Sequence, residues 1–295
     1  MRPNTKPKKV HFHFEPHRAW DKFMQRPTGH RPKNFFYEEA LGRKGFDKNE
    51  LAAILEHGDF HHHQMAKRIL NLQKQGSKTS VGEYRWSLLP NRVYLAGINQ
   101  MLERTSFMEH PSLDTYKRYA EAMVSWGKIR HKKIRKNLIS ASKKGSVEAV
   151  YGTTHSLLSA ELRKKGIESS RSIKPTIFSW SNMCLRKMQA GKTPTEMEYL
   201  RGAVSELIGT TPIWDKLGVM STGRDGQRYV LLENALLMRL SKDQLKFALN
   251  SPELIFTLNG LPKPQYLEGK QFWLSARKFM EKHSSAYQRM RLKRK

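Results

Sequence analysis

The chain has 295 residues, 38% of them hydrophobic, so it can bury the core of one large domain or of two smaller ones. Its 54 Lys and Arg residues against 26 Asp and Glu residues give a net charge of +28, spread over both halves of the chain and larger than solubility requires. We therefore expect a polyanionic partner, and we favour nucleic acid over an anionic membrane surface or an acidic protein.

Residues 1–46 are predicted to form an extended arm, because five prolines interrupt them and their apolar side chains follow neither a helical nor a strand period. Interleaved aromatic and basic residues can lie along folded nucleic acid, with rings against bases and cations against phosphates. The predicted phosphate contacts are Lys8, Lys9, Arg18, Arg31 and Lys33, and the predicted stacking residues are Phe12, Phe14, Trp20, Phe35, Phe36 and Tyr37. The alternative is that the aromatic residues fasten the arm to its own domain.

An N-terminal helical unit is predicted at 47–165. Asp47 and Glu50 form a capping-box pattern in front of the apolar run LAAIL, and Asp59 caps the next helix. After a break rich in Gly, Ser and Lys at 76–82, the segments PNRVYLAGINQMLERT and VEAVYGTTHSLLSAELRKKG both follow a helical pattern.

The longest predicted helix, residues 111–145, contains the basic segment KIRHKKIRK without any acidic residue. The residues at helical spacing that form one cationic stripe are Lys128, Lys132, Arg135 and Lys136, with Arg130 and Lys133 at its edges. Like charges at this spacing destabilise an isolated helix by roughly a few tenths of a kcal/mol per pair. A bound polyanion would explain why they are tolerated, whereas the alternative is an ordinary solvated face.

A linker is predicted at 166–175, followed by a C-terminal helical unit at 176–283, although one continuous domain remains an alternative. The segment PTIFSWSNMCLRKMQAG is helical in pattern. Thr193 is the predicted N-cap of the next helix, with Glu196 at the reciprocal capping position. Ser241 with Gln244 opens a further helix, and the last predicted helix covers about 268–283.

One segment, GRDGQRYVLLE, differs from the helical pattern, because Asp225 and Gly226 precede a β-prone run and predict a small hairpin near 224–232. The predicted fold class is therefore mainly α: a helical body with that hairpin and with extended basic arms at both ends. The C-terminal arm is the tail 284–295, whose predicted nucleic-acid contacts are Arg289, Arg291, Lys293, Arg294 and Lys295.

Enzymatic motifs are weak in this sequence. Histidines at 61, 62 and 63 point in three directions on a helix, so we predict no metal site there and no cofactor. Gly191-Lys192-Thr193 lacks the first glycine of a phosphate-binding loop and is better explained as a helix stop. Cys184 lies in an apolar helical pattern, which predicts a buried thiol in a reducing compartment and no disulfide-linked partner.

These observations favour a non-catalytic RNA-binding protein of a large ribonucleoprotein, with ribosomal RNA and neighbouring proteins as partners. A mitochondrial ribosomal protein fits the dispersed charge best, because such proteins meet RNA from several sides, and we therefore favour the mitochondrial matrix over nucleus or cytoplasm. The alternatives are a DNA-binding regulatory or chromatin-type protein and a nucleic-acid-processing enzyme. No apolar run is long enough to span a bilayer, and the first residues lack a signal-peptide core.

Overall fold

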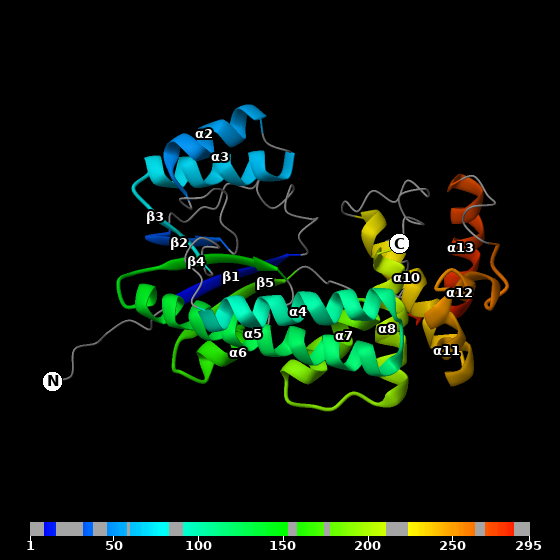
Figure 1. Ribbon diagram of the computed structural model, residues 1–295. Helices are drawn as coiled ribbons and strands as arrows, with labels where there is room; N and C mark the ends of the chain where they lie inside the picture. The colour runs from blue at the N-terminus through cyan, green and yellow to red at the C-terminus, as the bar shows by residue number, and fades with distance from the viewer. Residues whose placement is uncertain are drawn as a thin grey trace. The chain divides into compact units, whose positions relative to one another are not determined.

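The computed structural model describes residues 9–15, 32–37, 46–57, 60–82, 91–152, 158–173, 178–210, 224–262 and 269–285. The chain divides into two compact units, the first made of residues 1–95 and 126–176 and the second of residues 96–125 and 177–295. The described residues are mainly α-helical, as predicted, but the first unit also contains a parallel sheet that the sequence analysis did not predict (Figure 1). Within the described part of the chain, no helix combines the length and apolar character needed to cross a bilayer.

The sheet has five strands in the order β3-β2-β4-β1-β5, and every neighbouring pair is parallel. The strands are β1 (Lys9–Glu15), β2 (Asn34–Tyr37), β3 (Lys78–Val81), β4 (Val147–Gly152) and β5 (Glu168–Ile173). Asn34 lies opposite Lys78 of β3 and Val147 of β4, and Val147 lies opposite Val10 of β1. Because all strands run the same way, all their amino ends meet at one edge of the sheet.

Helices cover both faces of this sheet (Figure 1). On one face, α2 (Lys48–His57) and α3 (Phe60–Lys74) pack on Phe35 and Tyr37 of β2. On the other face, α5 (Leu113–Ser142) and α6 (Leu158–Arg163) pack on Phe36, which points the opposite way from its neighbours. The first unit is therefore a three-layer α/β/α arrangement, in which side chains of the parallel strands are buried on both faces.

Three predictions for this unit are wrong. The described residues of the predicted arm, in β1 and β2, form central strands rather than an extended arm. The predicted linker at 166–175 contains β5, and the first six residues of the predicted helix at 147–166 form β4. The predicted break between helices at 76–82 is present, but it contains a strand, β3. The strands escaped notice because parallel strands pair with distant segments and have no hairpin turn to mark them.

The second unit is built from helices around one core. It contains most of α4 (Asn91–Glu109), the first part of α5, α7 (Trp180–Gln189), α8 (Glu196–Thr210), α10 (Arg224–Arg239), α11 (Lys242–Asn250), α12 (Leu254–Thr257) and α13 (Gly269–His283). Tyr116, Leu232 and Phe272 are among its buried residues. The predicted hairpin at 224–232 is wrong, because α10 runs through it and buries Leu231 and Leu232 in this core.

The helix caps show how locally the helices are encoded. The Asp47 carboxylate accepts hydrogen bonds from the backbone N–H groups of Asn49 and Glu50, as the capping pattern predicts. Ser241 and Gln244 form the complete reciprocal capping box at the start of α11. For α8, the predicted cap is shifted by two residues, because Thr195 and Glu198, rather than Thr193 and Glu196, exchange the capping hydrogen bonds.

Candidate nucleic-acid interface

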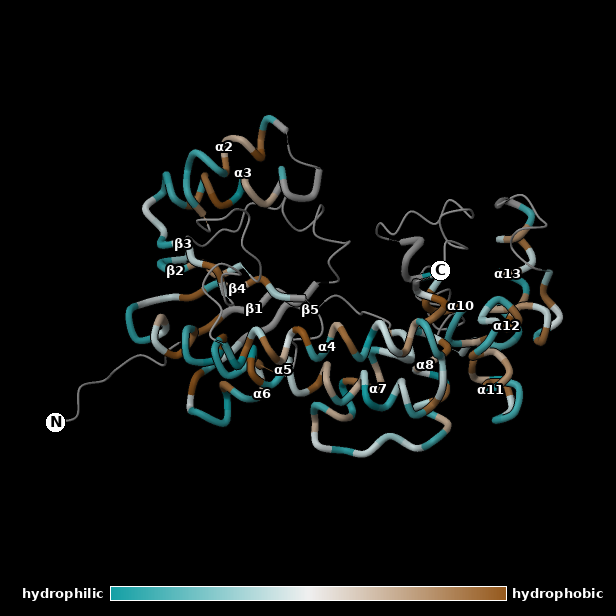
Figure 2. The backbone as a smooth tube through the Cα atoms, viewed as in Figure 1, coloured by the Kyte–Doolittle hydropathy of each residue, from teal (hydrophilic) through white to brown (hydrophobic). Residues whose placement is uncertain are grey.

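The basic segment of α5 has the predicted helical geometry. Lys128, Lys132 and Lys136 are exposed at successive four-residue intervals, while Ile134 and Leu138 are fully buried against the sheet. Figure 2 shows hydrophilic and hydrophobic residues alternating along this helix. We call these three lysines the α5 stripe; at about 1.5 Å per residue it is about 12 Å long.

The other cations of this segment are engaged within the protein. Arg135 forms an ion pair of 3.2 Å with Glu161 of α6, and each side chain is about a third exposed, at 35% and 34%. The guanidinium of Arg130 lies 4.3 Å from the ring centroid of Trp126, in cation–π geometry. Lys133 is partly buried and has a contact of its own. The predicted six-residue set therefore divides into three exposed lysines and three cations with internal partners.

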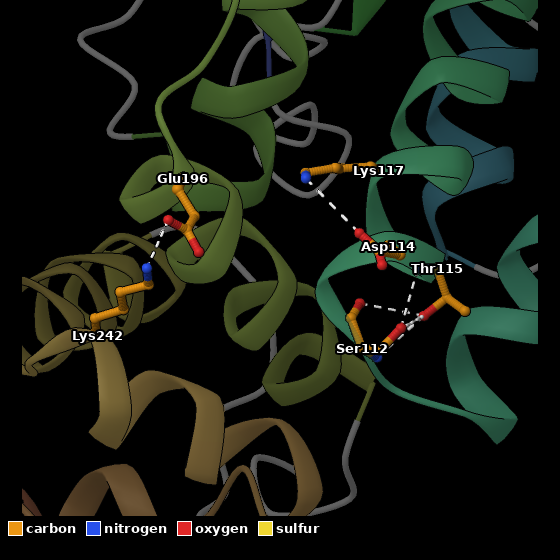
Figure 3. A network of polar contacts seen from close by, with 6 residues as sticks. All are labelled: Ser112, Asp114, Thr115, Lys117, Glu196 and Lys242. Carbon is orange, nitrogen blue, oxygen red and sulfur yellow. Dashed lines mark hydrogen bonds and ion pairs between the residues drawn. The ribbon is translucent and has the colours of Figure 1, made fainter.

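Several described cations of the second unit are paired with carboxylates, and Figure 3 shows two of these pairs. Lys242 meets Glu196 at 2.8 Å and joins the starts of α11 and α8, and Lys117 meets Asp114 at 3.7 Å. Lys187 donates two hydrogen bonds to Glu198, which lowers the pKa of that carboxyl group. Among the described residues, Lys128, Lys132 and Lys136 have no comparable carboxylate partner, so no described side chain neutralises the charge of the stripe.

The aromatic residues proposed for base stacking in β2 are core residues. Phe35 and Tyr37 are completely buried and Phe36 is 7% exposed, so their rings cannot reach a base. These three rings therefore fit the alternative given above, in which the aromatic side chains fasten this segment to its own domain. Lys33, immediately before β2, is exposed. Lys9, Phe12 and Phe14 belong to β1, but their side chains are outside the described set.

The remaining predicted contacts lie outside the described residues. They are Lys8, Arg18, Trp20, Arg31, Arg289, Arg291, Lys293, Arg294 and Lys295. They stay predictions from sequence.

Exposed lysines also lie in the turns that lead from helices into strands, and these were not predicted from the sequence. The pattern Lys-Gln-Gly at 74–76 precedes β3, and Lys-Lys-Gly at 143–145 and 164–166 precedes β4 and β5. This repeated pattern is the signal that could have revealed them, because glycine ends a helix and the lysines before it stay in solvent.

Candidate catalytic groups in the described part of the chain are few. Cys184 is buried, as predicted, and burial raises the pKa of its thiol to about 12, so it stays protonated at neutral pH. Among the described residues, no three His, Cys, Asp or Glu side chains lie close enough together to hold a metal ion. The side chains of His57, His61 and His62 are outside that set. Gly191 follows the end of α7 with a φ of 77°, as predicted for a helix stop.

One carboxyl group with a shifted pKa is enclosed in the second unit. Glu233 is 1% exposed and accepts a hydrogen bond from the Ser205 hydroxyl. Burial raises the pKa of Glu233 to about 7, with a further contribution from the Glu206 charge. Because the side chain is enclosed in the helical core, it cannot meet a macromolecular substrate, and we assign its titration to folding stability.

Replacing Glu233 by Gln should remove a pH dependence of the second unit. The unfolded carboxyl group loses its proton near pH 4.5, whereas the folded one keeps it to about pH 7, so stability falls between those values by up to about 3 kcal/mol. We expect Glu233→Gln to gain stability relative to the wild type on going from pH 5 to pH 8. Denaturant unfolding of both proteins at the two pH values measures this; an equal difference at both pH values would contradict the assignment.

Comparison with known proteins gives no relative: no protein-family model, no curated protein and no solved structure matches this chain.

Proposed function

We propose that this chain is a non-catalytic RNA-binding protein of a large ribonucleoprotein, and that a mitochondrial ribosomal protein is the best fit. The observation that supports the proposal most is the α5 stripe, in which Lys128, Lys132 and Lys136 are exposed on a helix whose opposite face is buried. The net charge of +28 also supports the proposal, because such an excess of positive charge favours binding to a polyanion.

The composition of the stripe favours phosphate contacts over the reading of bases. Its exposed residues are lysines, which meet phosphates as point charges, whereas sequence-specific readers rely on Arg, Asn and Gln to contact base edges. Asn137, which directly follows this segment, is partly buried and donates to the backbone carbonyl of Gly82. A structural RNA-binding protein needs only phosphate contacts here, so it is supported better than a sequence-specific DNA regulator.

The proposal predicts steeply salt-dependent binding to RNA. If about six phosphates are neutralised, log K should fall with log salt at a slope of roughly −4 to −5. Fluorescence anisotropy of the full chain with labelled RNA, from low to moderate salt, measures this slope. A slope near zero, or no binding at low salt, would overturn the polyanion argument.

Sedimentation distinguishes the assembly. Tagged protein expressed in cells should migrate with a large ribonucleoprotein on a density gradient, and the nucleic acid recovered with it should be ribosomal RNA. Recovery of a defined DNA duplex would favour the regulatory alternative, and RNA cleavage during the binding assay would favour the enzyme.

A further inference from the structure

Exposed lysines gather at the amino edge of the parallel sheet. The turns from α3 to β3, from α5 to β4 and from α6 to β5 all deliver the chain to this edge. In each turn a glycine has a positive φ, with values of 80° at Gly76, 146° at Gly145 and 70° at Gly166. Exposed basic residues lie in these turns, at the helix and strand ends beside them, and in the loop before β2. They are Lys33, Lys74, Lys78, Lys143, Lys144, Arg163, Lys164 and Lys165.

The strand register places these residues in a row. Lys78 of β3 lies opposite Asn34, which follows Lys33, and Asn34 lies opposite Val147, which follows the turn 143–146. On the far side of β1, Lys9 lies opposite Glu168, shortly after Lys164 and Lys165. Five strands about 4.8 Å apart make this row about 19 Å long. We call it the amino-edge row.

The middle of the row is held by hydrogen bonds to the backbone of Lys33. The Lys33 N–H donates to the Ser146 hydroxyl at 3.0 Å, and the Lys33 carbonyl accepts from the Lys78 N–H at 3.0 Å. The Lys33 side chain also lies directly against Gly145, where an added Cβ would be 2.4 Å from its Cδ. The loop before β2 and the turns into β3 and β4 are therefore fixed to one another, which lowers the conformational cost of binding a large anion.

The helix dipoles do not account for this much charge. The ends of α3, α5 and α6 each present roughly half a negative charge, about −1.5 in total, against eight basic side chains. Among the described residues, none of the eight forms an ion pair, and the acidic residue within the row is Glu168. A row with this excess charge and this rigidity fits an external polyanion.

We infer that the amino-edge row binds the phosphate backbone of double-helical RNA; this rests on the proposed RNA-binding function. Proteins usually bind single-stranded RNA through exposed aromatic rings that stack on its bases. The described part of this edge has no exposed aromatic residue. A helix exposes phosphates instead, in two rows along a groove. A row of about 19 Å is long enough to contact several phosphates along or across the wide, shallow minor groove of an A-form helix.

Two variants of equal charge change test the inference. In the edge variant, Lys78, Lys143, Lys144 and Lys164 are replaced by Gln. In the control variant, four exposed lysines of the second unit, Lys192, Lys246, Lys278 and Lys282, are replaced by Gln. Both variants lose four charges, so a difference between them reports the position of the charge. Binding of the full chain to a 20-base-pair RNA duplex and to a 20-nucleotide uridine strand is measured at about 0.1 M salt, with thermal melting of each variant as a check on folding.

We expect the edge variant to bind the duplex at least about a hundredfold more weakly, with a salt slope reduced by about three, and the control variant to stay within about fivefold of the wild type. Equal losses for both variants would overturn the inference while leaving the proposed function standing. Equal losses of the edge variant for duplex and single strand would overturn the assignment to double-helical RNA. Failure of the wild type to bind either RNA, with binding to vesicles rich in phosphatidylserine, would instead overturn the proposed function.

Discussion

Replacing Lys128, Lys132 and Lys136 together by Gln should weaken RNA binding by about two orders of magnitude at about 0.1 M salt. Each phosphate contact contributes a counterion-release term of about 0.7 to 0.9 per decade of salt, and three contacts are lost. The melting temperature should not fall, because the three side chains are exposed and Gln is a good helix former. Anisotropy and thermal melting on the same preparation measure both quantities.

Arg135 provides the control on the same helix. It lies next to the α5 stripe but pairs with Glu161 at 3.2 Å. Arg135→Gln should therefore cost less than about 1 kcal/mol of stability, as for other partly exposed pairs, and should change RNA binding by only a few-fold. If Arg135→Gln weakened binding as much as the triple substitution, the stripe would extend to Arg135 and the ion pair would be secondary. Unchanged binding in the triple variant would show that the stripe is an ordinary solvated face.

The helices were predictable because their signals are local. Asp47 and Ser241 precede helices in the sequence and cap the same helices in the structure. The shift from Thr193 to Thr195 at α8 shows the resolution of such signals, since two threonines flank Pro194 and either one satisfies the pattern. The existence of a helix was therefore predicted more reliably than its first residue.

The sheet was missed for a physical reason. β1 pairs with β4 and β5, which are more than a hundred residues away, so no local signal announces the pairing. β5 has the sequence ESSRSI, whose polar residues resemble a linker. Conversely, Asp225-Gly226 resembles a hairpin turn but lies at the start of α10, where burial of the following leucines outweighs the local preference.

The α5 stripe was predictable in part for the same reason. Helical spacing puts Lys128, Lys132 and Lys136 on one side, and the structure agrees. The same spacing also included Arg135, whose partner Glu161 is 26 residues away on another helix. Acidic residues close to Arg135 in the sequence give no indication of this pair, because Glu161 approaches Arg135 only in the folded structure. The amino-edge row was even harder to predict from the sequence, because its turns come together only through the order of the strands in the sheet.

Glu148→Gln should destabilise the first unit by about 3–5 kcal/mol. Glu148 of β4 forms an ion pair with Arg68 of α3, and the two side chains are only 7% and 9% exposed. The Arg68 guanidinium also lies 5.5 Å from the ring centroid of Phe35. Burial lowers the pKa of Arg68 and the Glu148 charge opposes that change, so removing the charge leaves a buried cation without this counter-charge. Denaturant unfolding at neutral pH measures the loss.

A double substitution separates pairing from packing. Arg68→Met with Glu148→Leu removes both charges and keeps apolar volume between α3 and the sheet, so it should cost much less than Glu148→Gln alone. In the single variant, the loss of stability comes from the buried Arg68 charge that no longer has Glu148 opposite it. A buried ion pair, by contrast, stabilises a fold little more than well-packed apolar residues do. If the double variant were as unstable as the single one, the cost would lie in lost shape complementarity under α3, and the ion pair would contribute little to it.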